Sequence, residues 1–166
     1  MRWFGLMGWS GSGKTTLITR LLPELTGRGL RVSTVKHAHH EFDIDKPGKD
    51  SYRHREAGAT EVMLTSSHRW ALMHEHRGAA EPDLGELARQ MAQVDLLLVE
   101  GFKRHPHPKL EIHRAALGKP LLYRDDPLVL AVASDTPLAG LTVPRFDLGD
   151  VRAIADCIVA HAAEVN

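Results

Sequence analysis

Residues 8–16 read GWSGSGKTT and directly follow the apolar run WFGLM at residues 3–7. The first eight of them match the pattern G-x-x-x-x-G-K-[ST], which forms a phosphate-binding loop between a strand and a helix. Both flanking elements are predicted here. The apolar run is typical of a buried strand, and the aliphatic residues after Lys14 recur at helical spacing up to Leu25. This stretch therefore predicts an α/β fold that begins with a strand, a P-loop and a helix.

The rest of the chain continues this alternation. Further strands are expected at residues 31–36, 95–100, 110–113 and 128–133, and helices at residues 51–57, 83–93 and after Asp150. Residues 62–64 and 69–73 are expected to pair as a hairpin. The run DLLLVE at residues 95–100 does not alternate, which favours a strand of a parallel sheet covered on both faces.

Together these patterns predict a P-loop NTPase-type three-layer sandwich with a mostly parallel central sheet and a protruding hairpin. No internal repeat or long linker interrupts the chain, so a single nucleotide-binding domain over residues 1–166 is expected.

The composition narrows the class of protein. Hydrophobic residues make up 43% and charged residues 25% of 166 residues, which is typical of a globular protein. Lys plus Arg equals Asp plus Glu at 21 each, so charge gives no argument for a nucleic-acid or membrane-surface partner. The single cysteine, Cys157, excludes an intrachain disulfide. No signal peptide or apolar span is recognisable, and a cytoplasmic protein is expected.

The P-loop residues suggest how phosphates would be held. Glycines allow backbone angles that turn successive N–H groups toward an anion, and the positive end of the following helix dipole points at the same place. Lys14 is expected to reach the β- and γ-phosphates as a catalytic residue, and Thr15 to offer its hydroxyl to Mg²⁺. The predicted phosphate-binding residues are Gly11, Ser12, Gly13, Lys14, Thr15 and Thr16.

Acidic residues that could hold the metal lie at two places. Glu100 ends the most hydrophobic strand, and ligands bind at the carboxyl ends of strands in such sheets, so it is a candidate for catalysis and for Mg²⁺. Asp43 and Asp45 follow the second strand and are hard oxygen ligands for the same ion. His37, His39 and His40 form a cluster without a recognised metal-ligand spacing, which favours a solvated loop.

The base-reading residue is harder to assign. The guanine-reading pattern Asn-Lys-x-Asp is absent, because the only asparagine is Asn166. Asp135 comes just after a predicted strand, where its carboxylate would be able to accept hydrogen bonds from guanine. An ordinary turn acid before Thr136 and Pro137 explains it equally well.

Several stretches resemble one known family, the molybdopterin-guanine dinucleotide biosynthesis adaptor proteins, MobB. The resemblance covers essentially the whole chain and rests on GWSGSGKTTL, KHAHHEFDIDKPGKDSYRHREAGA, RWALM, DLLLVEGFK and AVASD. It implies a homodimeric GTP-binding P-loop protein with weak GTPase activity. Members of that family assist the nucleotidyltransferase MobA in attaching GMP to molybdopterin, and the resemblance implies the same role here. The resemblance also implies that residues 11–16 bind phosphate and that Glu100 and the DID segment lie near Mg²⁺.

One departure from related nitrogenase-iron-protein-type NTPases affects the expected chemistry. Those proteins carry a second lysine early in the P-loop, where this chain has Trp9. With no arginine finger identifiable, slow hydrolysis is expected.

Two other functions fit the sequence. A small-molecule kinase using ATP also needs a P-loop and an acid at a strand end, and a binding module would keep the nucleotide only as a structural ligand.

The hairpin, with Trp70, Leu72 and Met73, is expected to be covered by a second copy of the chain. Molybdopterin is a further candidate ligand for the basic residues 102–114, although a solvated connection is the simpler interpretation.

Overall fold

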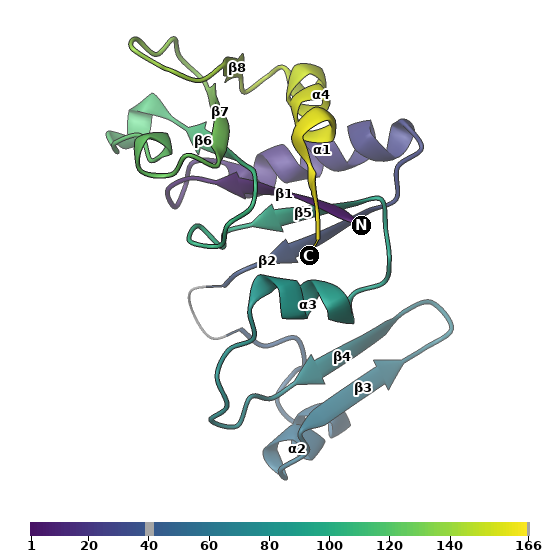
Figure 1. Ribbon diagram of the computed structural model, residues 1–166. Helices are drawn as coiled ribbons and strands as arrows, with labels where there is room; N and C mark the ends of the chain where they lie inside the picture. Colours follow the sequence, from purple (N-terminus) through teal and green to yellow (C-terminus); the bar gives the residue numbers. More distant parts are fainter. Residues whose placement is uncertain (39–41, 166) are drawn as a thin grey trace. The chain divides into compact units, whose positions relative to one another are not determined.

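The computed structural model describes residues 1–38 and 42–165. The chain packs into two compact units (Figure 1), one made of Met1–His37 and Leu84–Asn166 and the other of Ala38–Asp83. Compact packing alone does not define independent domains, so the single nucleotide-binding domain stays a prediction. None of the helices in the described residues is long and apolar enough to cross a membrane.

The larger unit is built on one sheet. Its strands lie in the order β2-β5-β1-β6-β7-β8, all parallel, and β9 pairs antiparallel with β1. The strands are β1 (Arg2–Met7), β2 (Val32–Lys36), β5 (Leu96–Glu100), β6 (Lys109–His113), β7 (Val129–Ser134), β8 (Arg145–Asp147) and β9 (Ala163–Glu164). This confirms the predicted α/β fold with a mostly parallel central sheet.

Helices cover both faces of this sheet (Figure 1). Alternate residues of β1 explain how. Phe4 and Leu6 pack with α1 (Lys14–Gly27) and α4 (Val151–His161), whereas Trp3 packs with α3 (Leu84–Gln90). The strand β5 is buried over all five residues, as its continuous apolar run predicted.

The smaller unit contains α2 (Asp50–Glu56) and the hairpin of β3 (Glu61–Thr65) and β4 (Trp70–His74). Val62 lies opposite Met73 in the antiparallel register, so the predicted hairpin is confirmed. These two side chains are buried, so the expectation that Met73 needs a second copy to cover it was wrong. The exposed large apolar side chains of the hairpin are Met63, Leu64, Trp70 and Leu72.

Four short elements were not predicted. They are β8, β9 and two 3-10 helices, η1 (Ala115–Leu117) and η2 (Tyr123–Asp125). The two strands have only three and two residues. They exist because the neighbouring strands β7 and β1 supply their hydrogen-bond partners.

Candidate functional site: the P-loop and the strand ends around it

The turn between β1 and α1 has the backbone that a phosphate-binding loop needs. Gly13 is the N-cap of α1 and has φ +98°, in the left-handed region that favours glycine. A Cβ on Gly8 would lie 2.4 Å from the carbonyl oxygen of Ile112, so this position has no room for a larger residue. The loop is therefore held close to β6 by its glycines.

The first helical residues leave their amides available. The N–H groups in the first turn of an α-helix lack an intrahelical acceptor, and those of Lys14, Thr15 and Thr16 are in this position. The N–H of Ser12 instead donates to Trp9 O at 3.1 Å, which closes a turn within the loop. The predicted phosphate-binding residues thus form one continuous loop and helix start.

The ammonium group of Lys14 lies within the loop. Its Nζ donates to Gly8 O at 3.1 Å and to Trp9 O at 3.0 Å. Burial lowers the pKa of Lys14; the Glu100 carboxylate opposes this, and the Lys103 and Lys36 ammonium groups lower the pKa further. The ammonium groups of Lys14, Lys36 and Lys103 therefore lie near the P-loop together with the single carboxylate of Glu100. This excess of positive charge favours binding of an anion.

The sheet brings Glu100 to the start of α1, as predicted. The Thr15 hydroxyl donates to Glu100 Oε1 at 3.0 Å, and Lys36 Nζ lies 3.3 Å from the same oxygen. This happens because β5 lies between β2 and β1, with Lys36 and Leu6 both paired in register with Glu100. A hydroxyl and a carboxylate at this spacing are the oxygen ligands that Mg²⁺ prefers, so the donor set fits that ion.

Asp135 lies at the end of β7, two strands away from β1. Its Oδ1 accepts a hydrogen bond from Ala115 N at 3.3 Å, and its Oδ2 lies 3.5 Å from Arg114 Nη1. Its side chain is 32% exposed, which leaves the carboxylate accessible to a ligand. The role of Asp135 in reading guanine stays a prediction.

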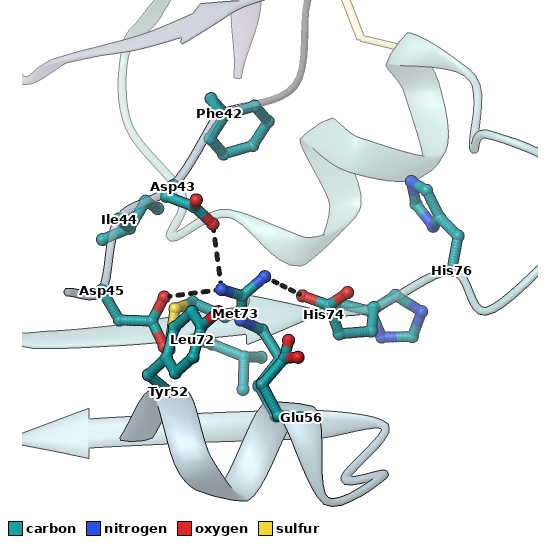
Figure 2. Close-up of a pocket in the computed structure, with 12 residues that line it drawn as sticks. Phe42, Asp43, Ile44, Asp45, Tyr52, Glu56, Leu72, Met73, His74 and His76 are labelled. Carbon is teal, nitrogen blue, oxygen red and sulfur yellow. Dashed lines mark hydrogen bonds and ion pairs between the residues drawn. The ribbon is translucent and has the colours of Figure 1, made fainter. Parts of the chain in front are cut away.

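Asp43 and Asp45 engage an arginine within the smaller unit. Figure 2 shows both carboxylates on the segment before α2, directed at one guanidinium. Arg55 Nη2 lies 2.9 Å from Asp43 Oδ1 and 3.2 Å from Asp45 Oδ1, and its Nη1 lies 3.7 Å from Glu75 Oε1. These groups line a cavity of about 560 Å³. A role of Asp43 and Asp45 in holding Mg²⁺ stays a prediction.

His37 is the member of the histidine cluster that lies within the described residues. His39 and His40 lie outside the described residues. His37 packs its ring near that of Phe102, with ring centroids 5.0 Å apart. Within residues 1–38 and 42–165, no group of three His, Cys, Asp or Glu side chains is arranged to hold a metal ion.

Sequence reasoning did not find the contacts that two side chains, Arg114 and Trp9, make at the P-loop. Arg114 Nε donates to the P-loop carbonyl of Ser12 at 3.0 Å. Trp9 Nε1 donates to Pro120 O at 2.8 Å, and Lys103 and Lys119 lie over its indole at 5.2 and 5.6 Å. The available signal for Arg114 was its place directly after a predicted strand, the same signal that identified Asp135.

Comparison with known proteins agrees with this fold. Residues 3–135 match the family model described as MobB, molybdopterin guanine dinucleotide synthesis protein B. The chain belongs to the MobB family. The match includes every candidate site residue described above, from the P-loop to Asp135.

Two relatives share nearly half of the sequence, and both are named molybdopterin-guanine dinucleotide biosynthesis adapter protein. The one from Escherichia coli strain K12 is 47% identical and covers 95% of this chain and 91% of the relative. The one from Haemophilus influenzae strain KW20 is 46% identical and covers 93% and 85%.

A crystal structure of molybdopterin-guanine biosynthesis protein B superposes with a TM-score of 0.75 at 29% identity. The match covers 95% of this chain and 98% of that one. The chain is accordingly an adapter protein of molybdopterin guanine dinucleotide biosynthesis.

Proposed function

We propose that this chain binds GTP with Mg²⁺ through its P-loop, hydrolyses it weakly, and assists a MobA-type nucleotidyltransferase in forming molybdopterin guanine dinucleotide. The observation that carries the proposal is the hydrogen bond between Thr15 and Glu100 beside the first turn of α1. It joins the hydroxyl and the carboxylate that nucleotide-bound Mg²⁺ requires, next to amides suited to phosphate.

Residues 11–16 hold the phosphates in this proposal. The amides of the helix start donate to phosphate oxygens, and Lys14 exchanges its two loop carbonyl acceptors for the β- and γ-phosphates. Thr15 and Glu100 are the proposed residues for Mg²⁺, which would neutralise phosphate charge there. Asp43 and Asp45 are further candidates for Mg²⁺, and one oxygen of each carboxylate is paired with Arg55.

The proposal of weak hydrolysis rests on two residues, Arg55 and Trp9. Arg55, one of the arginines available as a finger, is held by three carboxylates. Trp9 occupies the position at which related NTPases carry a second lysine. A charge stabiliser of that kind raises the rate by a thousandfold or more. Binding, rather than turnover, is therefore the main use of the nucleotide in this proposal.

The proposed partners are a second copy of the chain and the nucleotidyltransferase. The hairpin exposes Trp70 at 65% and Met63 at 61%, both large apolar side chains that a second copy would cover. The adapter role supports a protein partner. Molybdopterin itself is a further proposed ligand.

Calorimetric titration tests this proposal. A non-hydrolysable GTP analogue and its ATP counterpart are titrated with Mg²⁺ into wild type, Asp135→Ala and Glu100→Gln. We expect wild type to prefer the guanine nucleotide, Asp135→Ala to lose that preference, and Glu100→Gln to lose the Mg²⁺-dependent part of the affinity. Asp125→Ala, which removes a carboxylate on η2, is the matched control.

Equal affinity for the two nucleotides in wild type, or preference for ATP, would contradict the GTP assignment. ATP consumption that requires an added acceptor would then identify a small-molecule kinase.

A further inference from the structure

The guanidinium of Arg114 lies directly against the P-loop backbone. Its Nε donates to Ser12 O at 3.0 Å. Both its Nε and its Nη2 lie 3.2 Å from the place where a Cβ on Gly13 would be. Three residues further on, Leu117 Cδ2 lies 3.6 Å from the corresponding position on Gly11. Glycine at the P-loop thus lets the segment after β6 approach the start of α1.

The same guanidinium reaches the predicted base reader. Arg114 Nη1 lies 3.5 Å from Asp135 Oδ2, while Ala115 N donates to Asp135 Oδ1 at 3.3 Å. Residues 114 and 115 therefore fix both oxygens of one carboxylate. The two side chains remain 40% and 32% exposed, so a ligand can contact both.

These contacts give Arg114 a restricted orientation. A free arginine side chain loses rotamer entropy when it packs against a ligand, and anchors at Ser12 and Asp135 reduce that loss in advance. A planar guanidinium also stacks well on aromatic faces, which an ammonium group on a flexible chain does less well. If a nucleotide binds as proposed, with its phosphates at the P-loop and its base at Asp135, the purine lies between them, beside Arg114.

We propose that Arg114 is the stacking platform for the purine base, beside Asp135 as the hydrogen-bond acceptor. This inference rests on the proposed nucleotide binding and deepens it. It supplies a cationic base contact in a chain that lacks the Asn-Lys-x-Asp pattern. Stacking is independent of the identity of the purine, whereas Asp135 selects guanine, so the two contributions are separable.

The test compares three ligands on matched variants of the full chain. Tripolyphosphate measures the P-loop alone, the ATP analogue adds a purine, and the GTP analogue adds guanine. Arg114→Lys keeps the charge without the planar group, and Arg114→Met removes both. Arg20→Lys is the control, because Arg20 donates to the carbonyls of Leu148 and Gly149 and to neither Ser12 nor Asp135.

The quantity compared is the ratio of the affinity for a purine nucleotide to the affinity for tripolyphosphate. We expect this ratio to fall roughly tenfold in both Arg114 variants, for the GTP analogue and for the ATP analogue. Arg20→Lys should keep the wild-type ratio. The inference is overturned if that ratio stays within about twofold of wild type. It is equally overturned if tripolyphosphate and nucleotide affinities fall together, since Arg114 would then only support the P-loop.

Failure of the proposed function gives a different result. In that case wild type itself would bind the GTP analogue no better than the ATP analogue, while the ratio of nucleotide to tripolyphosphate affinity would still report on Arg114.

Discussion

Lowering the pH from 7 to 5 is expected to destabilise the fold by about 2 kcal/mol through His107 alone. This side chain is 1% exposed and lies against β1, where a Cβ on Gly5 would be only 2.4 Å from its Nε2. Within the described residues, Nε2 has no hydrogen-bond partner. Burial lowers the pKa of His107 from 6.5 to about 4, and the nearby Lys109 ammonium group contributes to the shift.

The sign follows from proton uptake. Between pH 6.5 and 4 the unfolded chain holds a proton on this imidazole and the folded chain does not, so stability falls as the pH falls through this window. The slope approaches roughly 1.4 kcal/mol per pH unit in the middle of the window. The other charged groups that face the ring are His105, whose charge also lowers the pKa, and Asp126, whose charge raises it.

Urea unfolding at pH 7 and pH 5 measures this effect on wild type and His107→Leu. The drop in unfolding free energy between the two pH values should be about 2 kcal/mol smaller in the variant. His68→Leu, at an exposed position, should behave as wild type. An equal drop in wild type and His107→Leu would refute the reasoning, whatever the variant's stability at pH 7.

Three further predictions concern packing, capping and assembly. Gly5→Ala should lower the free energy of unfolding in urea by roughly 1–3 kcal/mol, because its Cβ would lie 2.4 Å from His107 Nε2. Gly27→Ala is the control and should not destabilise the fold, because its Cβ would have no atom within 4 Å. Equal effects of the two substitutions would contradict this prediction. Asp150→Ala should lower the melting temperature through a loss of roughly 1 kcal/mol, because Asp150 Oδ1 caps α4 at Ala153 N, and Asp150→Asn should retain most of it. Trp70→Ser should weaken the proposed dimer by at least roughly thirtyfold in sedimentation equilibrium, and an unchanged dissociation constant would exclude the hairpin as the interface.

Much of the fold was predictable because its signals are local. The strands β1 and β5 are apolar runs, the loop after β1 has a defined pattern, and Asp150 marks the start of α4. The strands β8 and β9 carry no such signal. Arg145–Asp147 is a mixed segment that becomes a strand only through its pairing with β7.

The candidate site was predictable where one rule sufficed. Glu100 was expected near Thr15 because residues at strand ends meet at one edge of a parallel sheet, and the hydrogen bond between them agrees with this. Arg114 was not found, because its approach to Ser12 depends on β6 lying next to β1, and strand order is not written in either segment. The ion pairs of Arg55 with Asp43 and Asp45 were not found either, because they depend on how the segment before α2 packs against this helix.

The order of the strands also sets a length scale for any ligand. The strands β2, β5, β1, β6 and β7 are consecutive neighbours in the sheet. At or just after their carboxyl ends lie, in the same order, Lys36, Glu100, the P-loop, Arg114 and Asp135. Since adjacent strands stand about 4.8 Å apart, the row from Glu100 to Asp135 spans three spacings, or about 14 Å. A nucleotide bound as proposed therefore lies extended across the strands, with its phosphates toward β5 and its base toward β7. A shorter anion would meet only the half of this row near β5 and β1, so the sheet would distinguish ligands by their length as well as by their charge.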